Sequence, residues 1–410
     1  MNIPKEEKRN FFAFIWHAFW LALAQTFAER NTVLPGLIIL VGGSQIEVGI
    51  LSAITVGVPI VAQLAFAGYL SQKKYKKKFL LLGIYLRVGA FLGTVWTLTK
   101  ATSITPAMVI TFVFIWMFIF SISGAFAGIS YTDILGKSIK GETRKKFFVV
   151  RQFLSSVGVL ISALIVREFL KGFPYPENYI YTFTAASLLL FIASLGFAVI
   201  KEKPTEKFRK EKGFFQVLKF IPKLLREDKR FRNFIFLINF VQLPLTLIPF
   251  FVVLAKNNFE LNKSSIGNFL LFQISGMIIS NFLWSKVVKN YSFKGVIKSA
   301  IGIEIFLPIL ALLAAHSGNI YFLNAVFFIA GTAMSAFKIA YEGMFLEITN
   351  ETNRAMYQGI KGSLNLTVAF FPLISGVLIN YIGFIPIFIG ASIVVAFAFL
   401  LPGKIECGNG

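Results

Sequence analysis

The sequence predicts an all-α integral membrane protein whose transmembrane helices form two six-helix halves. Three observations lead to this fold class. Of the 410 residues 56% are hydrophobic, apolar runs of helical length recur along the whole chain, and the two halves share residues at matching positions. Soluble domains are about 45–50% apolar. Runs of about 20 apolar residues fit helices that satisfy their backbone hydrogen bonds inside lipid.

Twelve apolar segments are long enough to be membrane spans, six on each side of a polar stretch in the middle of the chain. From this division we expect an N-terminal bundle of residues 1–200, a linker of residues 201–230 and a C-terminal bundle of residues 231–410. The expected spans are 11–40, 46–70, 79–98, 106–131, 147–166, 179–200, 231–254, 264–287, 293–315, 320–341, 360–380 and 384–401.

The charge distribution predicts the topology. The net charge of +22 would suit a nucleic-acid partner in a soluble protein. Here Lys and Arg gather in the loops that face the cytoplasm if the N-terminus does, as the positive-inside rule requires. Lys73, Lys74, Lys76, Lys77 and Lys78 place the second-to-third connection inside. We therefore expect a multi-pass protein of the cytoplasmic (inner) membrane with both termini cytoplasmic, and no nucleic-acid partner.

The central polar stretch, Lys201 to Arg232, holds 12 Lys or Arg and five Asp or Glu. Its apolar residues Phe214, Leu218, Ile221 and Leu225 recur at helical spacing between basic ones. This pattern is typical of an amphipathic helix at a membrane surface. We interpret the segment as a cytoplasmic linker that lies on the anionic inner leaflet.

Cysteine and histidine offer no cofactor chemistry. The single cysteine, Cys407, excludes an intramolecular disulfide, and His17 and His316 have no partner at ligand spacing. No metal site and no cofactor are expected. The apolar run after Asn10 is too long for the core of a cleavable signal peptide, so we expect it to remain as a span.

An internal repeat relates the two halves. The residues Thr32 and Pro35 of the first expected span correspond to Thr246 and Pro249 of the seventh. A shift of 210 residues aligns two inner loops without a gap, matching Tyr131 with Tyr341, Arg144 with Arg354, Phe147 with Tyr357, Arg151 with Lys361 and Leu154 with Leu364.

Six-plus-six helices, a long central loop and a parallel repeat resemble the major facilitator superfamily (MFS) of secondary transporters. The resemblance covers nearly the whole chain. A loop motif of that family, Gly-x-Leu-(Ala/Ser)-Asp-(Arg/Lys)-x-Gly-(Arg/Lys)-(Arg/Lys), is matched by Gly68, Leu70, Ser71, Lys73, Lys76 and Lys77. The motif's Asp is Gln72 here and its second Gly is Tyr75. Since that Asp belongs to an inner-gate charge network in the family, we expect a different latch here, to which Asp133 and Arg144 contribute.

The resemblance implies a central cavity lined by helices one, four, seven and ten. Ionisable side chains inside a bilayer are costly and usually face such a cavity. Glu29 and Arg30 lie in the first span, and they are our first candidates for ion and solute binding. Adjacent helical residues point about 100° apart, so they are not expected to pair with each other. The alternative is that one of them reaches the outer interface. Further polar cavity candidates are Gln25, Asn239, Gln242, Trp116 and Asn324.

Other charged residues are interpreted as gating or structural groups. Arg87 and Glu304 lie at similar depths in the two halves, and we expect the pairs Arg87–Asp133 and Glu304–Lys338. Structural pairing is favoured over solute contact because helices three and nine are peripheral in the family's fold. The full set of gating or structural candidates is Gly68, Gln72, Lys73, Lys76, Arg87, Asp133, Arg144, Glu304, Lys338 and Arg354.

These features predict a secondary transporter that moves a small solute by alternating access. No Gly-x4-Gly-Lys-(Ser/Thr) loop occurs, so energy would come from an ion gradient or the solute's own gradient. Proton coupling through Glu29 is our hypothesis, and a monomer is expected. One alternative is a non-transporting sensor or scaffold with the same fold. Another is a lipid-acting enzyme, which is disfavoured because clustered nucleophiles, acid–base pairs and metal ligands are missing. The Glu29–Arg30 pair favours a polar or charged solute, whereas apolar cavity walls favour a hydrophobic one.

Overall fold

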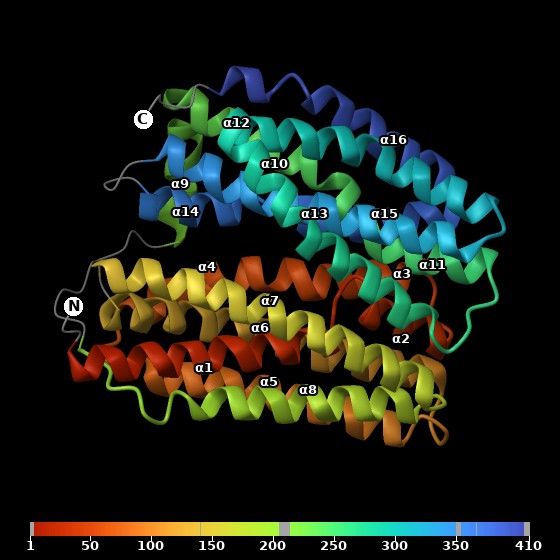
Figure 1. Cartoon of the computed structure of the whole chain (residues 1–410), viewed down its shortest axis with the longest axis horizontal. Coiled ribbons are helices and arrows are strands. Elements are labelled where there is room, and N and C mark those ends of the chain that lie inside the picture. The colour runs from red at the N-terminus through yellow and green to blue at the C-terminus, as the bar shows by residue number, and fades with distance from the viewer. Residues whose placement is uncertain (1–3, 140, 205–213, 350–353, 366, 406–410) are drawn as a thin grey trace. The chain divides into compact units, whose positions relative to one another are not determined.

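The structure is a computed structural model that describes residues 4–139, 141–204, 214–349, 354–365 and 367–405 (Figure 1). Within these ranges the regular elements are helices, and no strand occurs. Nine of the described helical segments are long and apolar enough to cross a membrane. Together with the family match reported below, they make the chain a multi-pass membrane protein. Exposed apolar side chains such as Phe282, Phe397 and Ile385 are those expected to face lipid.

Packing divides the chain into two compact units. The first contains Met1–Glu29 and Val58–Phe214, and the second contains Arg30–Gly57 and Phe215–Gly410. Residues 30–57, which belong to the first two expected spans, thus pack with the C-terminal elements. The bundles of 1–200 and 231–410 and the linker of 201–230 were defined by the sequence repeat instead, and those boundaries stay a prediction.

The first unit is a bundle of helices that run alongside one another (Figure 1). Helix α5 packs against α6 and α8, α1 packs against α7 and α8, and α4 packs against α6. The bounds are α1 Lys5–Phe27, α4 Val58–Ser71, α5 Lys77–Thr99, α6 Pro106–Ser138, α7 Gly141–Gly172 and α8 Glu177–Leu195. Helix α6 begins where Thr105 accepts the N–H of Met108 and Pro106 occupies the first turn, where its missing N–H costs nothing.

The second unit is built around α12 and α13, which pack along each other. Its elements are α2 Val33–Val41, α3 Gln45–Ser52, the π-helix η1 Ala53–Gly57, α9 Phe214–Glu227, α10 Lys229–Thr246, α11 Ile248–Asn258, α12 Ser265–His316, α13 Ile320–Ile348, α14 Arg354–Ser363, α15 Thr367–Ile382, α16 Phe384–Ala398 and the 3-10 turn η2 Pro402–Lys404. Side-chain caps start three of these helices: Ser44 at α3, Asp228 at α10 and Asn319 at α13.

The contact between α12 and α13 is a backbone contact. A Cβ added to Gly276 would overlap the carbonyl oxygen of Phe328, and one added to Gly331 would overlap that of Gln273. Small residues allow membrane helices to approach this closely. The two glycines therefore determine how α12 and α13 pack.

Each expected span is mainly helical in its described residues, but several differ from one straight helix. The eighth and ninth spans both lie in α12, on either side of a break at Ser292 (φ 60°, ψ −176°). The second span contains η1, and the twelfth is the 15-residue α16, shorter than a full span. The count of twelve transmembrane helices therefore stays a prediction.

The first span is broken in the middle and the seventh is tightened there. The first divides into α1 and α2 between Ala28 and Thr32, and in the seventh a single turn residue, Leu247 (φ −86°, ψ −11°), separates α10 from α11. Proline offers no N–H and its ring clashes with the carbonyl four residues earlier, which ends a helix before it. Pro35 and Pro249 lie just after these breaks, at equivalent positions of the repeat.

The linker forms α9 in its second half, as its spacing predicts. The side chains of Phe214 and Leu218 lie outside the described part. Ile221 and Leu224 are buried in the core cluster of the second unit, whereas Lys223 and Arg226 are exposed. The described apolar side of α9 therefore packs on protein, and its basic side is solvent-facing.

Candidate functional site

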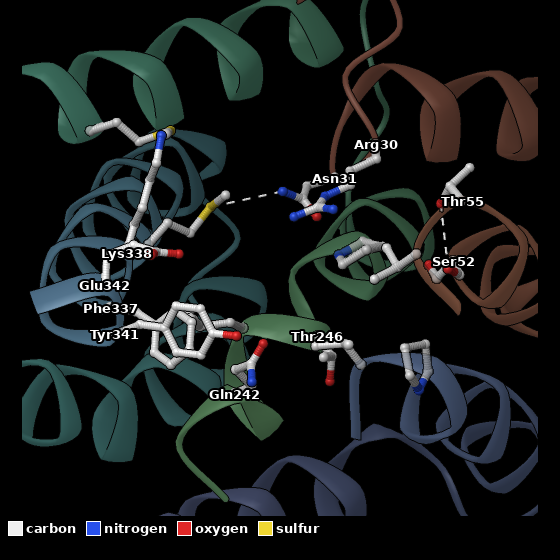
Figure 2. Close-up of a pocket in the computed structure, with 17 residues that line it drawn as sticks. Arg30, Asn31, Ser52, Thr55, Gln242, Thr246, Phe337, Lys338, Tyr341 and Glu342 are labelled. Atoms are coloured by element: carbon white, nitrogen blue, oxygen red, sulfur yellow. Dashed lines mark hydrogen bonds between the residues drawn. The ribbon is translucent and has the colours of Figure 1, made fainter. Parts of the chain in front are cut away.

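The second unit contains a pocket of about 440 Å³. It lies among the α1–α2 break, α3, η1, α10, α11, α12, α13 and α15, so residues from both sequence repeats line it. The polar lining side chains are Arg30, Asn31, Ser52, Thr55, Gln242, Thr246, Lys338, Tyr341 and Glu342, and the apolar ones are Val56, Leu245, Pro249, Met277, Met334, Phe337, Val368 and Pro372. Figure 2 shows Arg30, Gln242 and Tyr341 projecting toward the open centre from different elements.

The pocket lies at the two proline-associated helix breaks. Arg30 and Asn31 come from the break between α1 and α2, and Thr246 and Pro249 come from the ends of α10 and α11 that meet at the other break. Asn31 donates a hydrogen bond to the sulfur of Met334 at 3.8 Å, which joins the first break to α13. Interrupted membrane helices expose backbone groups and are a recurrent feature of solute sites in transporters.

A third interruption, between α14 and α15, is stabilised by hydrogen bonds from side chains of α10. Asn239 donates to the carbonyl of Leu364 at 2.9 Å, and its Oδ1 accepts the N–H and the hydroxyl of Thr367 at 3.1 and 2.9 Å. Gln242 and Asn365 exchange amide hydrogen bonds of 2.8 and 3.3 Å. Asn239 thus satisfies the backbone of the break, whereas Gln242 both supports the break and lines the pocket.

The pocket lining has more basic than acidic side chains. Arg30 and Lys338 are exposed to it, and neither forms an ion pair within the described part of the chain. Glu342 is the acidic lining residue, and its Oε1 lies 3.7 Å from Nζ of Lys361. Lys361 is 1% exposed, and its ammonium lies 3.9 Å from the ring centre of Tyr341 and 4.1 Å from that of Phe345.

The two leading candidates of the first span separate. Arg30 lines the pocket, but Glu29 and Gln25 are not among its lining residues. Glu29 is half-buried in the break itself and Gln25 is exposed near the end of α1. The break also means that Glu29 and Arg30 do not occupy successive positions of one helix, on which the estimate of their 100° separation relied.

Trp116 and Asn324 are not pocket residues either. Trp116 donates its indole N–H to the hydroxyl of Thr97 at 3.0 Å and covers Gly93, so it joins α6 to α5. Asn324 is buried in α13, and its Oδ1 accepts no hydrogen bond within the described residues. Both residues belong to the helix packing of their own units.

Within the described residues, no ion pair joins Arg87 to Asp133 or Glu304 to Lys338, so the structure does not contain the two expected pairs. The Arg87 guanidinium lies 4.1 Å from the ring centre of Phe120, whereas Asp133 pairs with Lys76 at 2.9 Å and with Lys137. Glu304 is 0% exposed in α12, and neither carboxyl oxygen has a described partner. Lys338 lines the pocket instead. Sequence depth alone does not determine which face of a helix a side chain occupies.

The loop between α4 and α5 uses an acid from outside its motif. Glu202 accepts the backbone N–H groups of Lys76 and Lys77 at 2.6 and 2.8 Å, at the start of α5. The Lys77 ammonium donates to the carbonyls of Ala198 and Ile200. A carboxylate at a helix N-terminus satisfies unpaired N–H groups and interacts favourably with the helix dipole. Glu202 therefore binds the loop that lacks its own acid at position 72.

The remaining loop candidates have local roles. Gln72 is exposed, Lys73 lies 4.3 Å from the ring centre of Tyr69, and Arg144 donates to the carbonyls of Gly136 and Ile139 at the end of α6. Arg144 thus caps α6 and does not pair with Asp133. Gly68 and Arg354 lie on helices, but their side-chain surroundings are outside the described part of the structure.

Sequence reasoning missed Tyr341, Glu342 and Lys361 as site residues. Tyr341 and Lys361 had been noticed only as repeat partners of Tyr131 and Arg151. The available signal was the same repeat, because it places an aromatic residue and a cation together at an inner helix end in both halves. Among the described residues, no group of three or more His, Cys, Asp or Glu side chains could hold a metal ion.

Comparisons with known proteins agree on one family. The family model described as Major Facilitator Superfamily matches residues 11–256 and 234–404. The solved D-xylose–proton symporter is 15% identical, with 96% of this chain and 97% of that chain covered and a TM-score of 0.71. A mutant form of the nucleoside transporter NupG is 14% identical, with 96% and 99% covered and a TM-score of 0.70.

A third similar structure is the inward-open xylose transporter XylE from E. coli, which is 16% identical, with 98% and 96% covered and a TM-score of 0.64. At these identities the structures show the fold alone. No curated protein sequence matches the chain significantly.

Proposed function

Because this chain belongs to the Major Facilitator Superfamily, it is a secondary transporter that works by alternating access, and we propose that its solute is a small polar molecule bound in the pocket of the second unit. One observation carries the assignment of the site. The pocket lies where the first and seventh spans are interrupted, just before two prolines, Pro35 and Pro249, that occupy equivalent positions of the two repeats. Its volume falls in the range of about 300–1,000 Å³ that is typical of small-molecule sites.

The test is to fill the pocket without disturbing the fold. Thr246→Trp places a large ring beside Pro249 and should abolish solute flux in proteoliposomes while leaving the melting temperature nearly unchanged. Ile279→Trp is the matched control, because Ile279 lies on α12, is 57% exposed and does not line the pocket. Equal flux in the two variants would refute the assignment of this site.

The solute can be sought by ligand stabilisation. A ligand that binds the folded state raises its apparent stability by RT ln(1 + [L]/Kd). Sugars, amino acids, nucleosides, organic anions and organic cations should be screened for an increase in melting temperature. A hit that stabilises the unmodified protein and Ile279→Trp, but not Thr246→Trp, supports binding in the pocket. Uptake of that hit into proteoliposomes distinguishes a transporter from a scaffold.

We also propose that transport is coupled to protons through Glu29. This carboxyl group is half-buried in the α1–α2 break, one residue before the pocket residue Arg30. Glu29→Gln should abolish solute accumulation driven by a pH gradient but preserve solute exchange at equal pH. Glu260→Gln is the control, since Glu260 is an exposed loop residue. Undiminished pH-driven accumulation by Glu29→Gln would contradict this role.

The proposed location is the cytoplasmic membrane, with both termini inside and the protein acting as a monomer. The distribution of Lys and Arg supports this orientation. Cys407, the single cysteine, permits a direct test with a membrane-impermeant maleimide. Labelling in inverted vesicles but not in intact cells is expected, and the opposite pattern would reverse the orientation.

A further inference from the structure

The pocket of the second unit has two exposed cations and one acid among its lining residues. Arg30 enters from the α1–α2 break, whereas Lys338 and Glu342 are four residues apart on α13. In Figure 2 the Arg30 guanidinium lies beside Asn31 on one side of the open space, and Tyr341 and Gln242 lie on another side. The charge that a solute encounters depends on whether Glu342 neutralises one of these cations.

Glu342 forms an ion pair with a different cation, Lys361. Its carboxylate lies 3.7 Å from the ammonium of Lys361, and no ion pair joins it to Lys338 within the described residues. Lys361 is 1% exposed and is enclosed by the rings of Tyr341 and Phe345. A buried ammonium requires a counter-charge, because an unpaired charge away from water is very costly. Glu342 therefore compensates Lys361, and among the described residues Arg30 and Lys338 have no acidic partner of their own.

Two uncompensated cations inside a membrane protein favour an anion. A charged side chain at membrane depth is costly, and groups of this kind mark solute and ion paths. We propose that the transported solute is a small organic anion with one or two negative charges, held by Arg30 and Lys338. This inference rests on the proposed function, because it assigns a chemical class to the solute of that same pocket.

The other lining groups indicate an organic anion. The hydroxyl of Tyr341 also lines the pocket and can donate a hydrogen bond to a carboxylate or phosphate group, whereas both N–H groups of the Gln242 amide already donate to Ile238 and Asn365. The lining also includes the apolar side chains of Met277, Met334 and Phe337. An inorganic anion would leave these side chains without contacts. A carboxylate or phosphate ester with an apolar or weakly polar body would use both kinds of lining side chain.

The sign of the pocket's charge can be measured without knowing the solute. In a Cys407→Ser background, Thr246→Cys places one thiol in the pocket. Its reaction with a negatively charged sulfonate and a positively charged trimethylammonium methanethiosulfonate is then timed. Each rate is divided by the rate of the same reagent with a free thiol in solution. Even at the dielectric constant of water, one charge about 6 Å away changes a local concentration about threefold.

We expect the anionic reagent to be favoured at least about tenfold over the cationic one after this normalisation, since each pocket cation acts on both reagents in opposite directions. Arg30→Gln and Lys338→Gln should each reduce the preference about tenfold, because each removes an attraction of about threefold for one reagent and a repulsion of about threefold for the other. Lys289→Gln should leave it unchanged, because Lys289 is an exposed residue of α12 outside the pocket. No preference, or a preference for the cationic reagent, would overturn the proposal.

The ligand screen completes the test. Mono- and dicarboxylates and phosphate esters should raise the melting temperature, and their neutral amide or alcohol analogues should not. Arg30→Gln and Lys338→Gln should weaken the stabilisation at least about tenfold in concentration, whereas Lys289→Gln should not. If a neutral or cationic solute is instead stabilising and is lost in Thr246→Trp, the pocket is the solute site and the anion assignment is wrong. If no stabilisation depends on Thr246, the proposed site itself fails.

Discussion

The pair between Glu342 and Lys361 gives the sharpest energetic prediction for the second unit. The two charges are 3.7 Å apart, which corresponds to about 4.5 kcal/mol of attraction at an effective dielectric constant of about 20. This figure is an upper limit, because the Glu342 side chain is 57% exposed and water screens it. We expect about 1–2 kcal/mol for the pair. The two aromatic rings add cation–π stabilisation of about 2 kcal/mol to the ammonium.

The prediction is a double-mutant cycle. Glu342→Gln leaves a buried ammonium without its counter-charge and should lower the free energy of unfolding by about 1–3 kcal/mol. Lys361→Met replaces the ammonium by an apolar chain that can pack on the same rings, so it should cost less than about 1 kcal/mol. With Met at position 361, Glu342→Gln should have almost no further effect. The interaction energy is read from the difference between the two losses.

Melting temperatures of the four proteins in nanodiscs measure this cycle. For domains of 150–250 residues about 1 kcal/mol shifts Tm by about 2–4 °C, so the loss in Glu342→Gln should be resolved. Glu260→Gln, at an exposed loop acid, controls for the general effect of removing a negative charge. Equal losses from Glu342→Gln with Lys or Met at position 361 would refute the pairing. They would also remove the reason for treating Arg30 and Lys338 as uncompensated.

Three further predictions concern packing, the loop between α4 and α5, and pH. Gly276→Ala should lower Tm strongly, because its Cβ would overlap a backbone carbonyl of α13, whereas Gly302→Ala in α12 meets nothing within 4 Å and should be neutral or stabilising. Glu202→Gln should cost about 0.5–2 kcal/mol in thermal unfolding, since the carboxylate accepts two N–H groups at the start of α5, and an unchanged Tm would contradict this role. Burial and the 2.8 Å hydrogen bond to Asp228 raise the pKa of Tyr357 to about 12, so its stabilising contribution should be full below about pH 10 and lost as pH rises through about 12. Tyr357→Phe should be less stable at pH 8 and show a flatter pH dependence of Tm between about pH 10 and 12.

Composition and the recurrence of apolar runs were sufficient to predict the helical membrane fold. They were not sufficient to predict where helices break. The sequence around Glu29 to Thr32 is polar for only four residues, and the apolar run resumes at once. Hydropathy averaged over a span conceals such a short interruption. The informative residue was Pro35, whose repeat partner Pro249 follows a second break.

The site could be predicted in part. Arg30 and Gln242 were expected in a cavity and line the pocket. Asn239 was expected there for the same reason, but its amide supports the interrupted backbone between α14 and α15. A polar side chain in a span indicates that it has a polar group to hydrogen-bond with inside the membrane. The sequence does not say whether the partner is a solute or the chain's own backbone.

The charge pairs failed for a related reason. The sequence placed opposite charges at similar depths on neighbouring helices, and we paired them for that reason. The partner that a charged side chain actually contacts depends on the rotation of its helix and on the loops beside it. Asp133 pairs with Lys76, which precedes α5, and not with Arg87. Lys338 lines the pocket, whereas Glu304 is fully buried in α12. From the sequence alone, the expected pairs and the observed contacts are equally favourable electrostatically.

The helix breaks and the uncompensated cations explain each other. Inside a membrane, irregular backbone is tolerated only where it is buried in protein or lines a water-filled cavity. The interruptions before Pro35 and Pro249 both border the pocket, so irregular backbone and polar side chains lie together there. The same surroundings reduce the cost of Arg30 and Lys338. Water solvates both the backbone and the cations when the pocket is empty, and an anion with hydrogen-bonding oxygens does so better, because it also neutralises charge. A neutral solute could satisfy the backbone but would displace water from two cations, which is why the arrangement selects against it.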